Sequence, residues 1–510
     1  MVTPRSLRPP EPHPIPLGSL FPGTDRPDVG VSGITLDSRL VQPGDLYVAL
    51  PGRSTHGARF AAAAVDAGAA AVLTDAEGAA LAAGLPAAVV VVADPRRAMA
   101  GAAADIFGRP SERLTMLAVT GTNGKTTTSY LLEAALRAAG RRPGLIGTIG
   151  FRLDGQALES ARTTITTPES PELQALLATM REGGADSVVM EVSSHAVVLG
   201  RADAITFDVA GFTNFGRDHL DFHGTEEAYF EAKAELFTAA RTRHAVVNID
   251  DPRGRQLADR VRAGAAVRLT TTSLAPGADF FPDRIEPQTD GSSRLVLTTP
   301  LGQLDLVLGL PGEFNIANAV TAVAMLAAVD VDLDRAVTGL AAAQVPGRMQ
   351  RVDLGPEAPT VIVDFAHTPQ AVGSVLSSLA GRRCIVVLGA GGDRDVQKRG
   401  PIGAAAARGA AVVIVTDDNP RTEEPAAIRA RVLEGAREVA TSLTGGVEVL
   451  DGGDRRSAIR LALQRAGVHD VVAILGKGHE EGQEVSGTVH PFSDSAVVEQ
   501  EWNVLNGGAA

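Results

Sequence analysis

The segment LTMLAVTGTNGKTTTSYLLEAALRAAG, residues 114–140, decides the fold class of this 510-residue chain. Its apolar beginning, 114–120, predicts a buried strand, and its Ala/Leu-rich end, 129–140, predicts a helix. The glycine-rich turn between them exposes backbone N–H groups at the positive end of the helix, where phosphate oxygens bind. This order of elements predicts a P-loop within a parallel α/β sheet.

The turn GTNGKTTT, 121–128, supplies the candidate ligands for ATP and Mg²⁺. We expect Lys125 to reach the β- and γ-phosphates and the Thr126 hydroxyl to hold Mg²⁺. The alternative is a glycine turn that begins an ordinary helix. The general P-loop pattern has a glycine where this chain has Val119, so the loop is shorter, which disfavours motor ATPases, helicases and GTPases. The residues assigned to ATP by this motif are Gly121, Thr122, Asn123, Gly124, Lys125, Thr126 and Thr127.

Length and composition limit the classes of protein to consider. The 510 residues exceed what one core can hold, and at about 150 residues per domain they predict about three domains. The most apolar stretch, around Leu81 to Ala93, is short and contains Pro86, so no membrane span is expected. A formal net charge of -13 disfavours a surface for nucleic acids or anionic membranes.

The start of the chain and its cysteine content favour a cytoplasmic protein. The proline-rich start, 1–18, lacks the apolar core of a signal peptide and is expected to be a loose tail. The single Cys384 can form no internal disulfide, which suits a reducing compartment. A monomer is the default expectation.

Short Val/Ile-rich runs alternate with Ala/Leu-rich helical stretches, which is typical of parallel sheets covered by helices. We therefore expect an α/β chain of three domains: an N-terminal domain at 1–108, a central P-loop domain with a parallel sheet at 109–345, and a Rossmann-like C-terminal domain at 346–510. A polar stretch at 273–294 is expected to be an excursion within the central domain. The predicted buried strands are 114–120, 187–192, 244–250, 360–365, 384–390, 411–417 and 471–477.

Two segments after predicted strands carry possible metal ligands. The strand SVVMEV ends near Glu191, at the position from which P-loop proteins ligate or orient Mg²⁺. The loop FTNFGRDHLDFHG, 212–224, follows another strand, and carboxylate and imidazole groups are compatible with Mg²⁺ or Mn²⁺, although His is unusual for Mg²⁺. The alternative is a capped loop with a hydrogen-bonded His. The candidates in the loop are Asp218, His219, Asp221 and His223.

A lysine lies on an apolar helical face in EEAYFEAKAELF, 226–237. Tyr229, Lys233 and Phe237 share this face at helical spacing. The ordinary explanation is a lysine that extends its ammonium to solvent. The alternative, which the neighbouring ligand-rich loop favours, is a buried amine with a lowered pKa that reacts with CO₂ to give a metal-binding carbamate.

Four segments in the last third place charged groups at the C-terminal ends of predicted strands, where open α/β sheets bind ligands. Each alone is compatible with an ordinary polar turn, but four in one domain predict a ligand site. In one of them Pro420 stiffens the turn that presents Asp418, Asn419 and Arg421. The segments are VDFAHTP (363–369), LGAGGDRDVQKRG (388–400), TDDNPRTEE (416–424) and GKGHE (476–480).

With these motifs the chain resembles the Mur ligases from LDSR at 36–39 to FSD at 492–494, and DNPR at 418–421 resembles the motif of members that add diaminopimelate. The resemblance implies an ATP- and Mg²⁺-dependent ligase of peptidoglycan synthesis, and so a role in cell wall biogenesis, cell shape and cell division. ATP would phosphorylate the free carboxylate of UDP-MurNAc-L-Ala-D-Glu, and the amine of diaminopimelate would displace phosphate. A folylpolyglutamate synthetase would share the short P-loop but lack LDSR and DNPR. Meso- and LL-diaminopimelate both remain possible.

The resemblance also implies roles for single residues. Lys125 would bind the phosphates, Thr126 and Glu191 one Mg²⁺, and His219 and carbamylated Lys233 a second. The sugar nucleotide would contact Leu36, Ser38, Thr166, Thr167, Ser193 and Arg201, with its uridine near Arg53 to His56. Further ATP contacts would come from Asn318, Arg348 and Asp364. Diaminopimelate would meet Arg394, Asp418, Asn419, Pro420, Arg421, Gly476 and Glu480.

Overall fold

A computed structural model describes residues 8–9, 13–52, 54–158, 166–216, 218–288, 291–393, 395–443 and 446–507. The chain forms two compact units, which are described separately. The first contains Met1–Pro287, Ser293–Leu308 and Ile316–Ala343, and the second contains Gln288–Ser292, Gly309–Asn315 and Gln344–Ala510. Within the described residues, no helix is both long and apolar enough to cross a membrane.

The first unit begins with a four-stranded parallel sheet in the order β3-β4-β5-β6. Apolar side chains cover both of its faces, with α4 on one face and α2 and α3 on the other, because buried parallel strands need a helix on each side. The elements are β3 Gly33–Thr35, β4 Asp45–Val48, α2 Ala61–Asp66, β5 Ala71–Thr74, α3 Ala76–Leu81, β6 Ala88–Val91 and α4 Pro95–Ile106.

The expected loose tail at 1–18 is wrong at its C-terminal end. Strand β1 (Ile15–Pro16) pairs with β2 (Gly30–Val31), and α1 (Leu17–Leu20) follows it directly. Leu17 is fully buried in the N-terminal core, and its backbone N–H donates to the carbonyl of Val29 at 2.8 Å. Burial of this apolar side chain and pairing of the backbone order a segment that proline content alone marks as loose.

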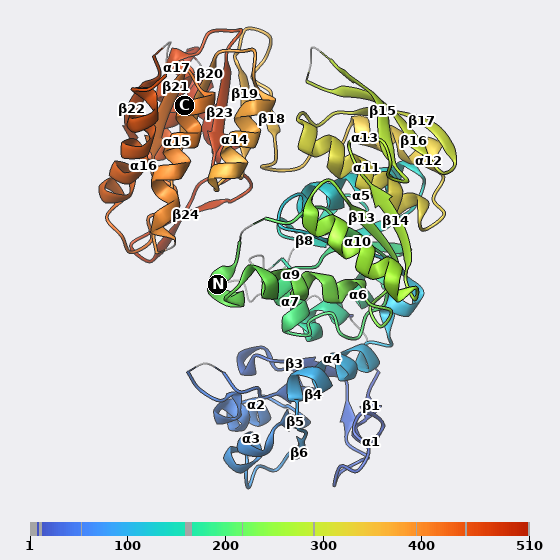
Figure 1. Cartoon of the computed structure of the whole chain (residues 1–510). Coiled ribbons are helices and arrows are strands. Elements are labelled where there is room, and N and C mark those ends of the chain that lie inside the picture. The colour runs from blue at the N-terminus through green and yellow to red at the C-terminus, as the bar shows by residue number, and fades with distance from the viewer. Residues whose placement is uncertain are drawn as a thin grey trace. The chain divides into compact units, whose positions relative to one another are not determined.

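The central sheet has eight strands in the order β10-β9-β8-β11-β7-β12-β13-β14, and the six from β8 to β14 in this order are parallel. One face carries α6, α7, α9 and α10, with α10 beside β13 and β14, and the other carries α5 (Figure 1). The strands are β7 Thr115–Thr120, β8 Pro143–Gly147, β9 Gly150–Leu153, β10 Gln156–Leu158, β11 Ser187–Glu191, β12 Phe207–Phe212, β13 Thr242–Asn248 and β14 Arg268–Thr272. The helices are α5 Lys125–Ala138, α6 Ser170–Glu182, α7 Ser194–Val198, α8 Leu220–His223, α9 Glu226–Ala234 and α10 Pro252–Gly264.

The polar stretch at 273–294 begins a separate antiparallel sheet, β15-β16-β17. Its first strand is largely exposed, whereas β16 carries the buried Leu295 and Leu297. One face of this sheet is therefore apolar and the other faces solvent. The remaining elements of this part are β15 Phe281–Pro287, β16 Ser293–Thr299, β17 Gly302–Leu308, α11 Glu313–Ala327, α12 Leu333–Ala336 and α13 Thr338–Ala341.

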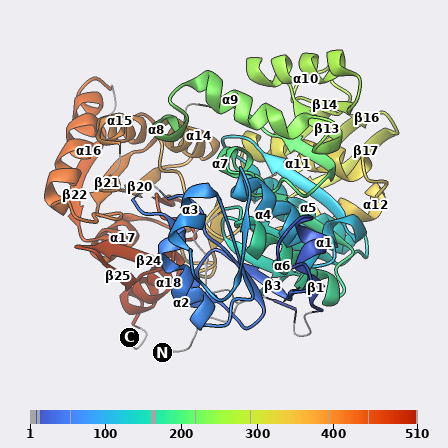
Figure 2. The same ribbon diagram turned by 90° about the horizontal axis from the view of Figure 1, so that it is seen from below.

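The second unit has a six-stranded sheet in the order β18-β19-β23-β20-β21-β22, in which only β18 is antiparallel to its neighbour. Helices α14, α15 and α16 pack on one face and α17 and α18 on the other (Figure 2). The predicted α/β class is therefore confirmed. The strands are β18 Gln350–Val352, β19 Thr360–Asp364, β20 Cys384–Leu388, β21 Val412–Thr416, β22 Glu448–Gly453 and β23 Val471–Leu475, with a hairpin β24 Gly482–Val485 and β25 Thr488–Pro491. The helices are α14 Pro369–Ser378, α15 Arg399–Gly409, α16 Pro425–Ala440, α17 Arg455–Arg465 and α18 Asp494–Leu505.

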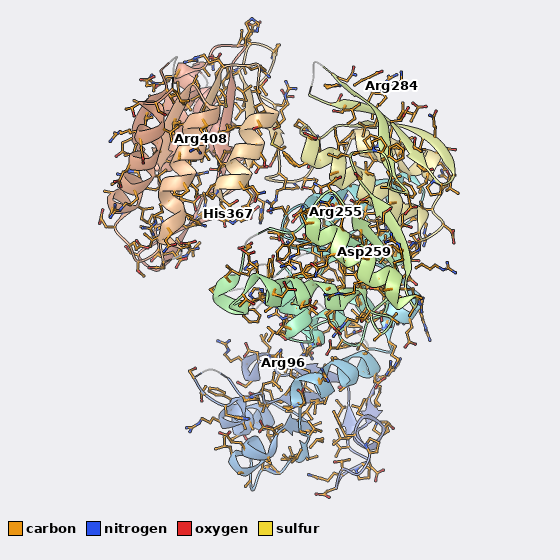
Figure 3. The ribbon with its side chains drawn as sticks, viewed as in Figure 1. Arg96, Arg255, Asp259, Arg284, His367 and Arg408 are labelled. Carbon is orange, nitrogen blue, oxygen red and sulfur yellow. The ribbon has the colours of Figure 1, made fainter. Side chains whose placement is uncertain are left out.

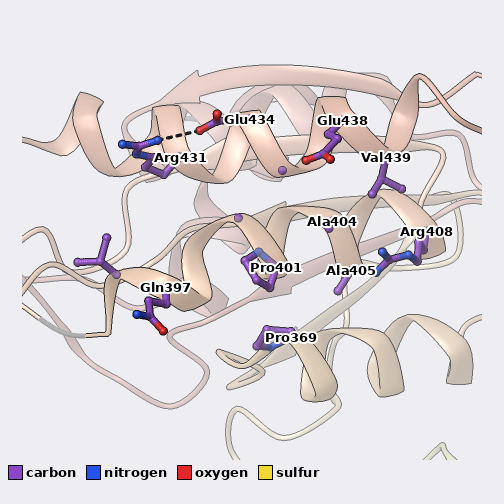
Figure 4. Close-up of a pocket in the computed structure, with 13 residues that line it drawn as sticks. Pro369, Gln397, Pro401, Ala404, Ala405, Arg408, Arg431, Glu434, Glu438 and Val439 are labelled. Carbon is purple, nitrogen blue, oxygen red and sulfur yellow. Dashed lines mark hydrogen bonds and ion pairs between the residues drawn. The ribbon is translucent and has the colours of Figure 1, made fainter.

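A groove runs along α15 and α16 on the outer helical face of this unit (Figure 4). Small residues such as Pro401 and Ala404 form its floor, and the ion pair of Arg431 with Glu434, 3.1 Å apart, lies on its rim. None of the single described residues assigned to ATP, metal, sugar nucleotide or diaminopimelate lines it, although Pro369, Val396, Gln397 and Gly400 belong to two of the segments predicted to bind a ligand.

Candidate active site

The P-loop forms between β7 and α5 as predicted. Gly121 and Gly124 adopt φ values of +150° and +84°, which side chains rarely tolerate. A Cβ at these positions would collide with the Thr213 hydroxyl and with the Asn318 carboxamide respectively. Both positions therefore require glycine, and Asn318 lies next to the loop. A tight glycine turn at the N-terminus of a helix is the geometry that fits a polyphosphate.

Cationic and hydroxyl groups line this loop. Lys125 Nζ donates to the carbonyls of Gly121 and Thr122, at 2.9 Å each. The N–H groups of Thr122 and Asn123 donate to the Asn214 backbone carbonyl and side chain, also at 2.9 Å. The loop that follows β12 therefore holds the P-loop in shape, and Thr127 is buried beneath it.

Glu191 ends β11 next to the P-loop and is fully buried. Its carboxylate accepts hydrogen bonds from the hydroxyls of Thr126 at 3.1 Å and Thr148 at 2.9 Å, and from the Thr148 N–H at 3.0 Å. A threonine hydroxyl beside a carboxylate is a donor set of the kind that suits Mg²⁺. Across the described residues no three His, Cys, Asp or Glu side chains group to hold a metal, and the predicted ligand set does not require such a group.

Lys233 lies on the buried face of α9, as its spacing predicts, with 1% of its surface exposed. Its Nζ donates to the Gly121 carbonyl at 2.9 Å and lies 4.5 Å from the centre of the Tyr229 ring. Burial lowers the pKa of this ammonium well below its usual range, the Lys125 charge lowers it further, and Asp218 opposes the shift. The ordinary explanation, a lysine that extends its ammonium to solvent, is therefore wrong for Lys233.

Three imidazoles cluster beside this lysine. The ring of His195 lies 4.8 Å from that of His219 and 5.5 Å from that of His223, measured between centroids. Burial is the main cause of a lowered pKa at both His219 and His195, and it lowers the pKa of His195 to about 4. Neutral imidazoles follow at neutral pH, and this is the form that binds metals. Of the acids in the loop, Asp218 lies 3.5 Å from His219 Nε2.

The predicted sugar-nucleotide residues of the central domain form one network. The Thr167 hydroxyl donates to the Glu191 carbonyl at 2.9 Å and accepts from the Ser193 N–H at 3.2 Å. Arg201 donates to the Thr167 carbonyl at 3.0 Å. The Thr166 and Thr148 hydroxyls are 3.0 Å apart.

A carboxylate connects this network to the N-terminal sheet. Glu169 accepts from Arg201 Nε at 3.0 Å and from Arg96 at 2.8 Å. Arg96 lies on α4 (Figure 3). Leu36 and Ser38 follow β3, where Leu36 packs against the N-terminal core and Ser38 begins a 3₁₀ turn capped by Asp37. Arg53 lies outside the described residues.

In the second unit the residues of DNPR and GKGHE come together at the carboxyl ends of β21 and β23. Asn419 Nδ2 donates to Glu480 Oε2 at 2.8 Å. Gly476 has φ +114°, and a Cβ there would approach the Asp418 carboxylate to 2.5 Å. The structure thus gathers these four residues at one strand-end site, as the sequence predicts.

Arg421 lies beside this group with its side chain already engaged. Its Nη1 donates to the Gly392 carbonyl at 2.7 Å, and its Nε lies 3.3 Å from the Glu484 carboxylate. Pro420 precedes it and brings its carbonyl close to Gly392. Arg394 lies outside the described residues.

Arg348 and Asp364 lie at another strand end of the second unit. Asp364 accepts from the N–H groups of Met349 at 2.7 Å and Ala366 at 2.8 Å, and burial raises its pKa. The Arg348 guanidinium lies 4.6 Å from the centre of the Phe365 ring. A cation and an aromatic ring side by side offer a stacking surface.

Comparison with known proteins identifies the lineage of these three regions. Family models match residues 30–107 as Mur ligase family, catalytic domain, 119–326 as Mur ligase middle domain, and 347–478 as Mur ligase, glutamate ligase domain. The UDP-N-acetylmuramoyl-L-alanyl-D-glutamate--2,6-diaminopimelate ligase of Streptomyces coelicolor is 48% identical over 92% of this chain and 92% of its own length. The chain belongs to the Mur ligase family.

Other Mur ligases agree over the full length. The protein of the same name from Pseudomonas aeruginosa is 43% identical over 94% of this chain and 96% of its own. A solved structure of a UDP-N-acetylmuramoyl-L-alanyl-D-glutamate--2,6-diaminopimelate ligase matches with a TM-score of 0.70 and 31% identity, covering 97% of this chain and 100% of that one. The resemblance to the Mur ligases and the three-domain α/β architecture are thereby confirmed.

Sequence reasoning missed several residues of this Mur ligase site. Asn214 hydrogen-bonds to the P-loop and Thr148 hydrogen-bonds to Glu191. Both contacts join distant segments of the chain, and no local sequence pattern predicts them. Lys477 belongs to the motif GKGHE and is fully buried beside Asn419 and Glu480. A basic residue between two glycines at a strand end could have indicated its role. Arg455 is buried against Asp494, and no sequence pattern around it predicts this position.

Proposed function

We propose that this Mur ligase is an ATP- and Mg²⁺-dependent acid–amino-acid ligase that joins diaminopimelate to the D-Glu carboxylate of UDP-MurNAc-L-Ala-D-Glu, in the cytoplasm and as a monomer. The observation that carries the proposal is the assembly of DNPR with Glu480 at one strand-end site of a chain that is 48% identical to a relative named for this reaction. The product belongs to peptidoglycan synthesis, so loss of the enzyme would impair the cell wall, cell shape and cell division.

The central domain, 109–345, supports the activation step. Lys125 and the P-loop backbone would bind the phosphates of ATP, while Thr126, Glu191, His219 and Lys233 as its carbamate would hold Mg²⁺. The ion, when bound, neutralises charge on the transferred phosphoryl group. The chain orients the sugar-linked carboxylate toward the γ-phosphate, and the resulting acyl phosphate is the electrophile for amide formation.

The carbamate on Lys233 is supported by burial and by its neighbours. A neutral buried amine adds to CO₂, an N–C bond forms, and one proton leaves, which converts the neutral amine into an anion that a metal can pair with. Its nearest basic neighbour, Lys125, bonds to the same carbonyl of Gly121, which disfavours a second ammonium there.

The other two substrates are assigned to separate surfaces. The N-terminal domain, 1–108, would bind the uridine end through Leu36 and Ser38, and the network of Thr166, Thr167, Ser193 and Arg201 would bind the muramoyl peptide. The C-terminal domain, 346–510, would bind diaminopimelate. There Arg394 and Arg421 would bind carboxylate, Asp418 and Glu480 would bind ammonium, and Asn419, Pro420 and Gly476 would contribute further contacts, because a zwitterionic centre needs both charges matched.

Arg348, Asp364 and Asn318 are proposed as further ATP contacts. A folylpolyglutamate synthase structure from Mycobacterium tuberculosis shares the fold with a TM-score of 0.60 at 22% identity. We expect a folylpolyglutamate synthetase to lack LDSR and DNPR, so these two segments favour the muramoyl ligase.

The decisive experiment measures ADP release with UDP-MurNAc-L-Ala-D-Glu and, side by side, meso-diaminopimelate, LL-diaminopimelate and lysine. We expect turnover that requires all three substrates and Mg²⁺, with one diaminopimelate isomer preferred. Turnover with a folate in place of the sugar nucleotide, or none with either isomer, would overturn the proposal.

A further inference from the structure

Lys477 lies in the turn after β23, wholly buried beneath the residues assigned to diaminopimelate. Its Nζ donates to Asn419 Oδ1 at 3.1 Å and to Glu480 Oε2 at 2.9 Å. Because Asn419 Nδ2 donates to the same Glu480 oxygen at 2.8 Å, the three side chains form a closed triangle. The ammonium therefore bonds to two groups of the proposed amino-acid site while itself remaining out of solvent.

The triangle determines which way the Asn419 amide faces. Its Oδ1 accepts from Lys477 Nζ and from the Glu484 N–H at 3.0 Å, so its Nδ2 must point to Glu480. Glu480 in turn has 35% of its side chain exposed, with Oε2 held by Asn419 and Lys477. Lys477 thus fixes the buried end of a carboxylate whose other end is open to a ligand.

Lys477 also sets the charge of the site. The buried Lys477 ammonium pairs with the Glu480 carboxylate at 2.9 Å, and the charge of the buried Arg455 also acts on Glu480. Removing Lys477 therefore leaves Glu480 without its direct ion-pair partner and makes the site one charge more negative. A zwitterionic centre, with an ammonium and a carboxylate, carries no net charge. A lysine substrate carries an ammonium without the carboxylate at its distal end, so it would gain from the extra negative charge that the intact site lacks.

The identity of the residue is informative as well. The chain has 47 Lys and Arg residues, and only four are lysines: Lys125, Lys233, Lys398 and Lys477. Two of these four bond to the P-loop. A compact ammonium with three rotatable donors can lie between an amide oxygen and a carboxylate where the planar guanidinium fork of arginine would not fit the same geometry. A lysine at position 477 therefore fits a residue that positions Asn419 and Glu480 better than one that only supplies positive charge.

We propose that Lys477 is a positioning and specificity-determining residue: it holds Asn419 and Glu480 for the distal ammonium of diaminopimelate and, by balancing Glu480, disfavours lysine. The proposal rests on the proposed function. Failure of that function would appear in the parent chain, as no diaminopimelate-dependent ADP release, whereas failure of this proposal appears only in the variants.

The test compares the parent with Lys477→Met, with Lys477→Met/Glu480→Gln, and with Arg431→Met, which removes an exposed cation of the same unit. Lys477→Met is expected to raise the diaminopimelate KM at least tenfold, leave the KM for ATP within about twofold, and lower the diaminopimelate-to-lysine ratio of kcat/KM at least tenfold. The double variant should keep the raised diaminopimelate KM but lose any gain toward lysine, because the uncompensated carboxylate is gone. Arg431→Met should match the parent.

Two results would overturn the proposal. One is a parent-like diaminopimelate-to-lysine ratio in Lys477→Met. The other, which applies even if that variant is too unstable to assay, is a parent-like diaminopimelate KM in the neutral double variant, where no buried charge is left unpaired.

Discussion

Lys233 Nζ and the carbonyl oxygen of Gly121 are 2.9 Å apart, across 112 positions of sequence, so a buried amine ties helix α9 to the P-loop. Lys125 donates to the same carbonyl from the other side. Two ammonium ions cannot share one oxygen in a buried site without strong repulsion. The arrangement favours Lys233 in its neutral form, which is the form that reacts.

Replacing Lys233 tests the carbamate directly. Lys233→Ala should lose most activity, and formate or acetate should restore part of it, because a small carboxylate can occupy the place of the carbamate. Activity would be measured as ADP release with and without added carboxylate. Unmodified lysine seen by crystallography at neutral pH with CO₂ present would contradict the idea, as would activity in Lys233→Ala that added carboxylate does not change.

Lys125 serves phosphate rather than sugar. Lys125→Ala is expected to abolish turnover and leave the Kd for UDP-MurNAc-L-Ala-D-Glu nearly unchanged, since its Nζ donates to the P-loop carbonyls of Gly121 and Thr122, where phosphate is expected to bind. Calorimetry supplies the Kd, and Arg262→Ala, an exposed cation on α10, is the matched control. A parallel loss of sugar-nucleotide affinity would mean that the site is not divided in this way.

Much of the architecture was predictable because its causes are local. Runs such as TMLAVT and SVVME are apolar on both faces, which only a covered parallel strand requires, and the structure has β7 and β11 there. The apolar periodicity of 226–237 likewise puts Lys233 on a helical face that the structure buries. Strand-end charges were predictable as a group because parallel strands deliver their carboxyl ends to one edge.

The remainder depends on contacts between distant segments. Arg455 meets Asp494 across 39 positions, and nothing in the sequence around either marks the pair. The predicted tail failed at Leu17 because its burial is decided by β2 and the N-terminal core, not by the prolines around it. Lys477 was visible in GKGHE, but its partner Asn419 lies 58 positions away.

The buried Arg455–Asp494 pair should be important for the stability of the second unit. Both side chains are fully buried, and their two parallel hydrogen bonds are 2.7 Å long. Arg455→Met leaves Asp494 uncompensated and is expected to cost about 3–5 kcal/mol in the free energy of unfolding. Arg431→Met, whose pair is two-thirds exposed, should cost at most about 1 kcal/mol. Urea titrations would compare them, and equal losses would contradict the prediction.

Cys384 offers a reporter for that unit. Burial raises the pKa of its thiol to about 12, with the Arg382 charge opposing. Because the thiolate is the reactive form, the folded protein at pH 8 should label with an aromatic disulfide reagent at least a thousandfold more slowly than in urea, and Arg455→Met should shorten this protection. Fast labelling of the native protein at pH 8 would contradict the buried position of the thiol.

The last prediction concerns the choice of amino acid. Arg421 has its Nη1 on the Gly392 carbonyl and its Nε near Glu484, so its guanidinium is held in place with its remaining donors available to a carboxylate. A site of buried polar partners rejects a ligand that leaves them unpaired by as much as about 10⁴-fold, beyond what an apolar pocket achieves.

Lysine lacks the distal carboxylate and should therefore be a very poor substrate of the parent chain. Arg421→Ala should raise the diaminopimelate KM at least tenfold and change the KM for ATP little, because the Arg421 guanidinium contacts Gly392 and Glu484, next to the residues assigned to diaminopimelate. Arg431→Ala is the matched control on the neighbouring helix α16. Efficient lysine turnover by the parent, or an unchanged diaminopimelate KM in Arg421→Ala, would overturn the substrate assignment while leaving membership of the Mur ligases intact, since that membership depends on the whole chain and not on this arginine.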